Sequence, residues 1–432
     1  MKLVWFFNNL RCHDNKALTR ACAESRGDEP VLALYCFDPQ FYRLDAYGFP
    51  RTGKFRAQFL LQSLDDLKHQ LARLNIPLLI KQGSPARVIP PLVTQHGITD
   101  LYLQREWTRD ERSALQALQA TPALHAVNIH QSYDQFLIHP DDLPFTDMAA
   151  IPEVFTRFRK TVEKALPVRE TLPTPAPRPA ANLSAVGDTG ELPTIEELGL
   201  ERPLPDPRSA FPFSGGSTAG HQRIRDYFWH SENITRYKQT RNGLLGTEYS
   251  SKLSPWLANG SLSAREVYWQ LKDFERDVKA NEDTYWLQFE LLWRDYFKYI
   301  SLKHGDRIFA LGGILDRRYQ WHLDPDQLTR WLEGRTPYDF VNANMREFAA
   351  TGWMSNRGRQ NVASYWAREL QHDWRAGAAW FESQLLDYDV HSNYGNWMYN
   401  SGVGNDPRDR QFNIPLQAER YDPDGAYRRL WL

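Results

Sequence analysis

Cysteine is scarce in this sequence, and long hydrophobic runs are absent. Cys12, Cys22 and Cys36 are the only cysteines among 432 residues. They lack the spacing of metal ligands and cannot all pair as disulfides. We therefore expect no metal site and a reducing compartment, the cytoplasm. The apolar start at residues 3–7 is too short for a signal peptide, and no run approaches the roughly 18–20 apolar residues of a membrane-spanning helix, so we expect no membrane association.

An excess of either charge is also missing. The chain carries 52 Lys and Arg against 53 Asp and Glu, a formal net charge of −1. Without a global attraction for phosphate, a nucleic-acid partner would have to bind at a local basic patch. The hydrophobic fraction of 42% is typical of a globular protein. Because single cores seldom exceed about 250–300 residues, the length predicts two domains.

The N-terminal part alternates strand and helix patterns but lacks a glycine-rich turn. A helix with one apolar face is predicted over residues 52–75. Such alternation predicts an α/β domain with a doubly wound parallel sheet, which is Rossmann-like. Residues 8–15, after the first predicted strand, contain no glycine, so a dinucleotide is not expected to bind there in the usual way. The predicted strands lie at residues 3–7, 31–37, 78–80, 101–103 and 126–129.

Proline is concentrated between the two predicted domains, for example at residues 172–179. Proline fixes φ and removes a hydrogen-bond donor, which disfavours regular structure. We interpret residues 136–210 as a linker that joins an α/β domain of residues 1–135 to a mainly α-helical domain of residues 211–432. Helical patterns in the second domain lie at residues 220–229, 263–278, 284–304, 326–333, 342–351, 359–373 and 376–386.

Tryptophan, by contrast, is abundant and unevenly placed. The sequence has 15 tryptophans, of which only Trp5 and Trp107 precede residue 200. Large aromatic side chains bury much area each, so a helical core explains most of the others. Periodicity alone does not distinguish core packing from a functional role for a few of them.

Several segments are specific enough to indicate a family. Residues 351–364 read TGWMSNRGRQNVAS, a polar helix start whose arginines can bind phosphate or carboxylate, and residues 387–399 read DYDVHSNYGNWMY. With four further segments, they resemble the cryptochrome/photolyase family over essentially the whole chain. Residues 356–361 and 404–407 are similar to the DASH cryptochrome branch. The further segments are NLRCHDN at 9–15, SSKLSPWL at 250–257, ELLWRD at 290–295 and GVGNDPR at 402–408.

The resemblance implies a fold, a cofactor and an activity. In the family, an α/β antenna domain precedes an all-α catalytic domain that holds FAD, which agrees with the missing glycine fingerprint. The DASH branch is associated with repair of cyclobutane pyrimidine dimers, driven by blue or near-UV light and preferential for single-stranded DNA. Reduced anionic FAD donates the electron. The resemblance implies a deoxyribodipyrimidine photolyase that binds damaged DNA, and we expect a monomer. The alternative is a non-catalytic blue-light receptor that signals through flavin photoreduction.

Residues matched to the family's FAD site fall into two groups. Hydroxyl and backbone groups would line the phosphate and ribitol side, although SSKLS alone could be an ordinary helix cap. Beside the flavin ring the resemblance implies an ion pair of Arg359 with Asp387 and a further carboxylate, Asp389. A buried Arg–Asp pair could also be purely structural. The other matched residues are Tyr237, Ser250, Ser251, Leu253, Ser254 and Asn356.

Four residues match positions that control the flavin's electrons. Asn393 matches the residue that faces flavin N5, where a neutral amide favours the anionic reduced flavin and a carboxylate would repel its charge. The alternative is that Asn393 caps its own turn. Trp397, Trp374 and Trp321 match the electron-transfer chain from flavin to surface, against the alternative of plain core packing.

The resemblance places the lesion pocket at Glu290, Trp293, Asn356, Gln360 and Tyr399. The aromatic rings can stack on a flipped dimer, while Glu290 and Asn356 can hydrogen-bond its carbonyl edges and stabilise the extra electron. Duplex-repairing photolyases carry Met in place of Gln360 and Trp in place of Tyr399. The more polar, smaller pocket favours single-stranded DNA. Asn356 replaces the catalytic His of (6-4) photolyases, which argues against that activity.

Two further expectations concern charged residues. Arg346, Arg357, Arg408 and Arg410 are candidates for DNA phosphate contacts, although scattered surface arginines are usually only solvated. Glu106 matches the carboxylate that binds the pterin ring of a 5,10-methenyltetrahydrofolate antenna. An exposed Glu at a helix start would look the same in the sequence.

Overall fold

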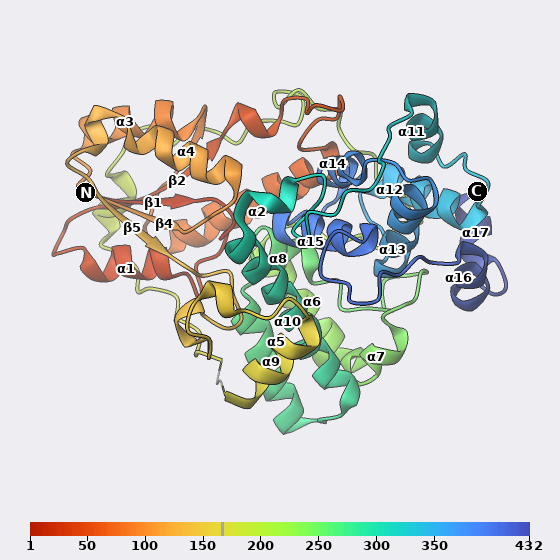
Figure 1. The fold of residues 1–432 in the computed structure, drawn as a ribbon. Coiled ribbons are helices and arrows are strands. Elements are labelled where there is room, and N and C mark those ends of the chain that lie inside the picture. Colours follow the sequence, from red (N-terminus) through yellow and green to blue (C-terminus); the bar gives the residue numbers. More distant parts are fainter. Residues whose placement is uncertain (166–167) are drawn as a thin grey trace.

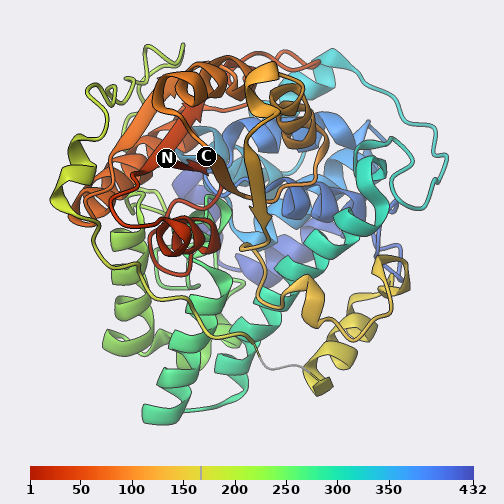
Figure 2. The same cartoon turned by 90° about the vertical axis from the view of Figure 1, so that its left-hand side faces the viewer.

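The computed structural model describes residues 1–165 and 168–432, and within them five parallel strands form one sheet in the order β3-β2-β1-β4-β5. The predicted doubly wound sheet is confirmed, and Figure 2 views it from the N-terminal side. The strand order reverses between β1 and β4, where a crevice forms at the carboxyl ends of the strands. The strands are β1 (Lys2–Phe6), β2 (Val31–Phe37), β3 (Leu78–Gln82), β4 (Asp100–Gln104) and β5 (Asn128–Ser132).

Helices cover both faces of this sheet. The buried residues Phe59, Leu64, Leu67 and Leu71 lie on one side of α2 (Lys54–Arg73), as the apolar periodicity predicted. With α1 (Lys16–Glu24), this helix packs in a core on one face. Residues of α3 (Pro85–His96) and α4 (Arg109–Gln119) pack in a second core on the other face.

The segment predicted as a linker contains a helix that the sequence did not indicate to us. In α5 (Phe155–Ala165), Phe155, Phe158 and Val162 are buried in the main core. The proline-rich chain that follows runs along the outside of the sheet part (Figure 2), where the Asn182 amide bonds both backbone groups of Val31. The domain limits at residues 135 and 210 stay a prediction.

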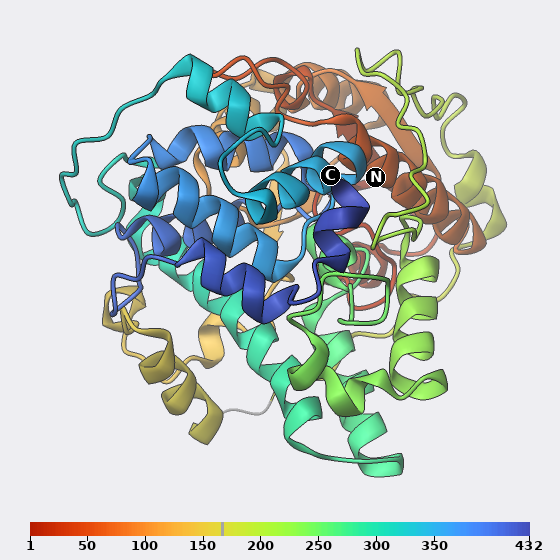
Figure 3. The same cartoon turned by 90° about the vertical axis from the view of Figure 1, so that its right-hand side faces the viewer.

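The second half is helical, as predicted, and lies beside the sheet (Figures 1 and 3). Several predicted boundaries were wrong. The α-helices expected over residues 220–229 and 359–373 end earlier, in π-helical segments at Arg225–His230 and Tyr365–Glu369, and the strand expected over 126–129 lies at Asn128–Ser132. The helices are α6 (Ser217–Ile224), α7 (Tyr237–Thr240), α8 (Ser254–Ala258), α9 (Ala264–Asp277), α10 (Glu282–His304), α11 (Pro325–Leu332), α12 (Asp339–Thr351), α13 (Asn356–Ser364), α14 (Trp374–Gln384), α15 (Val390–Ser401), α16 (Ile414–Tyr421) and α17 (Ala426–Trp431).

The long helix α10 lies at the centre of this half and contacts α5, α7, α9 and α15. A capping box formed by Asn281 and Thr284 fixes its start, because each side chain bonds the other's backbone N–H. Ser355 caps α13 by accepting from Gly358 N at 3.0 Å. Asp389 caps α15 in the same way. These caps fix the first residue of each of the three helices.

Within residues 1–165 and 168–432, no helix is both long and apolar enough to cross a membrane. The same residues contain no group of three or more His, Cys, Asp or Glu side chains placed to hold a metal ion. Cys12, Cys22 and Cys36 are all unpaired thiols.

Candidate functional site

A cavity lies among the helices of the second half, and we call it the helical cavity. It consists of two adjoining hollows of about 260 and 90 Å³. Both are bordered by Asn356, Arg359, Asp387, Asp389 and Ser392, so they form one space. Most residues matched to the FAD site therefore meet here. The larger hollow is further bordered by Tyr237, Ser250, Ser251, Leu253, Ser254 and Glu290, and the smaller by Gln360, Asn393 and Trp397.

The serine-rich wall before α8 is shaped by an arginine that the motifs did not indicate. The guanidinium of Arg223, buried on α6, donates to the backbone oxygens of Thr247, Ser250 and Ser251 at 3.0–3.1 Å. Next to them, Lys252 has a left-handed backbone with φ of 61°. Arg223 thus holds a non-repetitive segment in place along the cavity. Its partners lie far from it in sequence, so no local pattern could reveal it.

Arg359 and Asp387 form the expected ion pair across the cavity wall. Arg359 Nη2 lies 3.0 Å from both Asp387 Oδ1 and Oδ2, and its Nε donates to Met354 O at 2.9 Å. Asp387 is buried, whereas the Arg359 side chain is 25% exposed. The pair ties the start of α13 to the turn before α15. It leaves guanidinium N–H groups at the edge of the cavity.

Asn393 lies on the first turn of α15 and does not cap that turn. The cap is Asp389, whose Oδ1 accepts from Ser392 N at 2.8 Å. Asn393 Nδ2 instead donates to Ala378 O of α14 at 3.0 Å. Its Oδ1 is buried and has no hydrogen-bond partner among the described residues. A buried amide oxygen left in this way fits a donor on a bound group, as the flavin would provide.

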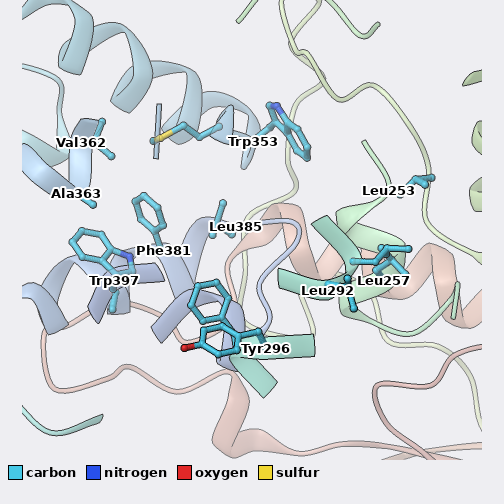
Figure 4. Packing of buried hydrophobic residues seen from close by; sticks show 14 of the residues in the cluster. Leu253, Leu257, Leu292, Tyr296, Trp353, Val362, Ala363, Phe381, Leu385 and Trp397 are labelled. Atoms are coloured by element: carbon cyan, nitrogen blue, oxygen red, sulfur yellow. The ribbon is translucent and has the colours of Figure 1, made fainter. Parts of the chain in front are cut away.

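The three tryptophans matched to the electron-transfer chain differ in depth, from buried Trp397 and Trp374 to partly exposed Trp321. Trp397 of α15 borders the smaller hollow, is 2% exposed and lies 5.1 Å from Phe381 between ring centroids (Figure 4). Its indole also packs against Gly377 of α14, where a Cβ would have no room. Trp374 starts that same helix and is fully buried. Trp321 is partly exposed, and the backbone beside it forms a bridge just before Trp374.

The side chains matched to the lesion pocket lie on α10, α13 and α15; Glu290, Asn356 and Gln360 border the helical cavity, whereas Trp293 and Tyr399 are not among its bordering residues, and not all five are free for a ligand. Glu290 pairs with Arg241, which the motifs did not indicate. Burial raises the pKa of Glu290, and the Arg241 charge opposes this rise. Trp293 stacks on Phe155 with ring centroids 3.7 Å apart, and Tyr399 meets it edge-on at 5.9 Å. One face of the Trp293 indole is therefore already covered by protein.

Several arginines cluster beside this pocket. Arg357 lies 4.5 Å from the centroid of the Tyr421 ring, and its Nη1 donates to Gln360 Oε1 at 2.8 Å. Burial and then the charges of nearby arginines lower the pKa of Arg357. Arg346 lies apart from this cluster and donates to Leu432 O at 2.9 Å. The neighbours of Arg357 are Arg241, Arg410 and Arg420.

A further cavity, of about 150 Å³, lies where the carboxyl ends of β1, β2 and β4 meet α10 and α15. We call it the interdomain cavity. Glu106, just after β4, borders it from the sheet side, and Lys298, Asp389 and Tyr394 border it from the helical side. Burial, and then the charge of Glu111, raises the pKa of Glu106 to about 7. Glu106 is thus a cavity residue, not an exposed residue at a helix start.

Two family models match the chain. The model described as DNA photolyase matches residues 2–180, and the model described as FAD binding domain of DNA photolyase matches residues 286–432. Cryptochrome DASH of Gloeobacter violaceus is 49% identical over 431 residues, which cover 100% of this chain and 85% of that protein. Cryptochrome DASH of Danio rerio is 45% identical, over 98% of this chain and 81% of that protein.

Solved structures agree with these matches. A cryptochrome from Synechocystis sp. PCC6803 superposes with a TM-score of 0.93 at 42% identity, covering 100% of this chain and 88% of that one. A bacterial class III photolyase from Agrobacterium tumefaciens superposes with a TM-score of 0.82 at 26% identity, covering 100% and 86%. The similarity therefore includes both the sheet part and the helical part.

Proposed function

Because the chain belongs to the cryptochrome/photolyase family and to its DASH branch, we propose that it repairs cyclobutane pyrimidine dimers in a light-driven reaction, preferentially in single-stranded DNA. The observation that carries the proposal is the shared wall of the helical cavity. Glu290, Asn356 and Gln360, which are matched to the lesion, border the same space as Asn393, which is matched to the flavin. A dimer held by the first group would lie next to a flavin held by the second.

FAD fits the helical cavity on the chemistry of its walls. Hydroxyls of Ser250, Ser251 and Ser254 would serve the phosphate and ribitol side. The Arg359–Asp387 pair and the unpartnered Asn393 Oδ1 would serve the flavin ring. When bound and reduced, FAD supplies one electron to the dimer on light absorption and receives it back after ring splitting, so there is no net redox change.

Asn393 has a specific task in this scheme. Its Nδ2 is already bonded to Ala378 O, so its Oδ1 is the amide atom left for a hydrogen bond with a bound group. An amide oxygen here could accept a hydrogen bond from a bound flavin without adding a negative charge. A carboxylate there would oppose the anionic reduced flavin.

Glu290 would position the lesion through a hydrogen bond to its carbonyl edge. Its Oε1 pairs with Arg241, which leaves Oε2 for a ligand. Burial raises the pKa of Glu290, so a proton on Oε2, which could be donated to a carbonyl oxygen of the dimer, would cost less than on a solvent-exposed carboxyl. The exposed Asn356 side chain offers a second amide contact at the other side of the cavity. Tyr399 and Trp293 would supply stacking.

The proposed preference for single-stranded DNA rests on the small stacking surface of this pocket. Tyr399 is a smaller stacking surface than Trp, and one face of Trp293 is occupied by Phe155. Extracting a dimer from a duplex costs unstacking and unpairing energy that such a pocket offsets poorly. The arginine cluster around Arg357 would hold the flanking phosphates, and that contact does not need a duplex.

We further propose that the interdomain cavity holds a 5,10-methenyltetrahydrofolate antenna through Glu106. A carboxylate in a crevice at the switch point of the sheet suits the edge of a pterin ring.

Trp397, Trp374 and Trp321 would carry electrons to oxidised flavin from the surface. We also propose that the protein acts as a monomer, because one chain supplies the walls of both cavities. The free cysteines favour a reducing compartment, the cytoplasm.

The test is repair itself. FAD-loaded, chemically reduced protein is illuminated with oligothymidine that contains a cyclobutane dimer, either single-stranded or annealed, and remaining dimers are counted by chromatography. We expect light-dependent loss of dimers, faster in the single strand. Failure to repair either substrate would contradict the proposal and favour the blue-light receptor. Equal rates on both would remove only the single-strand preference.

A further inference from the structure

The wall between the two cavities contains a buried ion pair. Lys298 of α10 donates through Nζ to Asp389 Oδ2 at 2.7 Å, and the two side chains are 4% and 12% exposed. Asp389 borders both cavities, whereas Lys298 borders the interdomain cavity. From the helical cavity, the carboxylate is therefore in front and the ammonium is behind it.

Burial disfavours both charges, and each group offsets this for the other. Burial alone would raise the pKa of Asp389, but the charges of Lys298 and Arg294 hold it well below its ordinary value. Burial lowers the pKa of Lys298, and Asp389 opposes this change. The carboxylate thus stays ionised at neutral pH beside the space matched to the flavin. Its field on that space depends on how well Lys298 compensates it.

The same pair fixes the helix that carries the flavin-side residues. Asp389 caps α15 through Ser392 N, and α15 goes on to Asn393 and Trp397. Lys298 lies on α10, which carries Glu290 two turns earlier. The pair therefore joins the helix matched to the lesion to the helix matched to the flavin.

We propose that Lys298 and Asp389 are positioning residues that set the reduction potential of the flavin, and this rests on FAD binding in the helical cavity but not on dimer repair. A carboxylate at the cavity wall disfavours an added electron on the flavin, and the ammonium behind it cancels part of that effect. Electrostatic interactions are stronger in a protein wall of low dielectric than in water, so charges in this wall should affect the flavin. Removing either partner exposes the charge of the other.

The opposite charges predict opposite shifts. Lys298→Met leaves the carboxylate uncompensated and should lower the flavin midpoint potential. Asp389→Asn keeps a residue that caps helices well but removes the negative charge, and should raise the potential. The double variant Lys298→Met/Asp389→Asn and the conservative variant Lys298→Arg should both stay near the unmodified protein. Lys303→Met is the matched control. Lys303 lies on the same helix as Lys298, and it forms an ion pair at 2.7 Å with Glu153, which lies outside that helix.

The experiment is a spectroelectrochemical titration of each FAD-loaded protein, with the FAD dissociation constant measured alongside. Shifts of opposite sign in the two single variants, restored in the double variant, support the proposal. Shifts of the same sign indicate a loss of packing only and overturn it, as does an unchanged potential in Asp389→Asn. If Lys298→Met does not retain FAD, Asp389→Asn and the double variant decide. A protein that shows the opposite shifts but repairs no dimer would contradict the repair proposal alone.

Discussion

The two cavities differ in how the chain builds them. The helical cavity is bordered by residues between Tyr237 and Asn400, all in the helical half. The interdomain cavity needs the ends of β1, β2 and β4 on one side and α10 and α15 on the other. The first therefore depends on helix packing, and the second on how the two halves meet. Because Asp389 and Arg294 border both, the cavities share a wall and yet should respond separately to substitutions elsewhere.

The largest expected effect comes from Trp397→Phe, which alters the helical cavity alone. Photoreduction of oxidised FAD should be almost completely lost, because the first member of the tryptophan path is removed. Repair by chemically reduced protein should continue, and the measurements are flavin bleaching under blue light and dimer loss. Trp331→Phe is the matched control, since Trp331 is fully buried, lies 6.3 Å from Trp397 and stacks on Trp366. Equal loss in both variants would mean packing, not electron transfer.

Arg359→Ala should weaken FAD binding in the helical cavity and leave folate binding in the interdomain cavity unchanged. The substitution leaves the buried Asp387 unpaired and removes a guanidinium that borders the cavity. Loss of one charge-assisted hydrogen bond to bound FAD would cost about 2 kcal/mol, which is about 30-fold in FAD affinity. Folate binding in the interdomain cavity should be unchanged. Fluorescence titration of apoprotein measures both constants, with the surface variant Arg276→Ala as control. Parallel loss of both ligands would show that the two cavities are not independent.

Glu106→Gln should have the reverse pattern. The pKa of Glu106 is raised to about 7, so its carboxyl is ionised above that pH and protonated below it. Affinity for methenyltetrahydrofolate should therefore fall as pH drops through 7, by up to about tenfold per pH unit. Glu106→Gln should bind weakly with little pH dependence while FAD binding stays unchanged. Glu201→Gln, at a highly exposed position, is the control. A full pH dependence in Glu106→Gln would assign the titration to another group.

The smallest expected effect is a change in substrate preference from Tyr399→Trp. A larger ring would stack better on a flipped dimer, and stacking on an aromatic side chain is worth about 1–3 kcal/mol per base. Replacing one aromatic by another should change only part of this, so the ratio of duplex to single-strand repair should rise a few-fold. The ratio is measured on the two oligothymidine substrates, with Tyr319→Trp as a control outside both cavities. A falling ratio would contradict the stacking role.

Patterns that repeat locally were predictable from the sequence. Strand–helix alternation indicated the parallel sheet, and apolar periodicity indicated α2. In α5, Phe155, Phe158 and Val162 also follow helical spacing, but the proline-rich context led us to interpret that segment as linker. The π-helical turn after α13 has no signature in the apolar periodicity of the sequence.

The site was predictable where contiguous motifs carry it. Residues 351–364 and 387–399 supplied the Arg359–Asp387 pair and Asn393. Arg223, Arg241 and Lys298 were missed, because their partners lie 24 to 91 residues away and single charged residues form no pattern. The stacking of Phe155 on Trp293 was equally invisible in the sequence. Motifs thus identify groups that meet a ligand, whereas the residues that hold those groups emerge only in three dimensions.

The central claim is that a dimer in the pocket takes an electron from light-excited reduced flavin in the same cavity. The most direct measurement is the fluorescence lifetime of bound reduced FAD, with and without a dimer-containing oligothymidine at saturating concentration. Undamaged oligothymidine of the same length is the control. We predict a clear shortening of the lifetime with the dimer only. An unchanged lifetime, with binding of the damaged strand shown independently, would contradict the account.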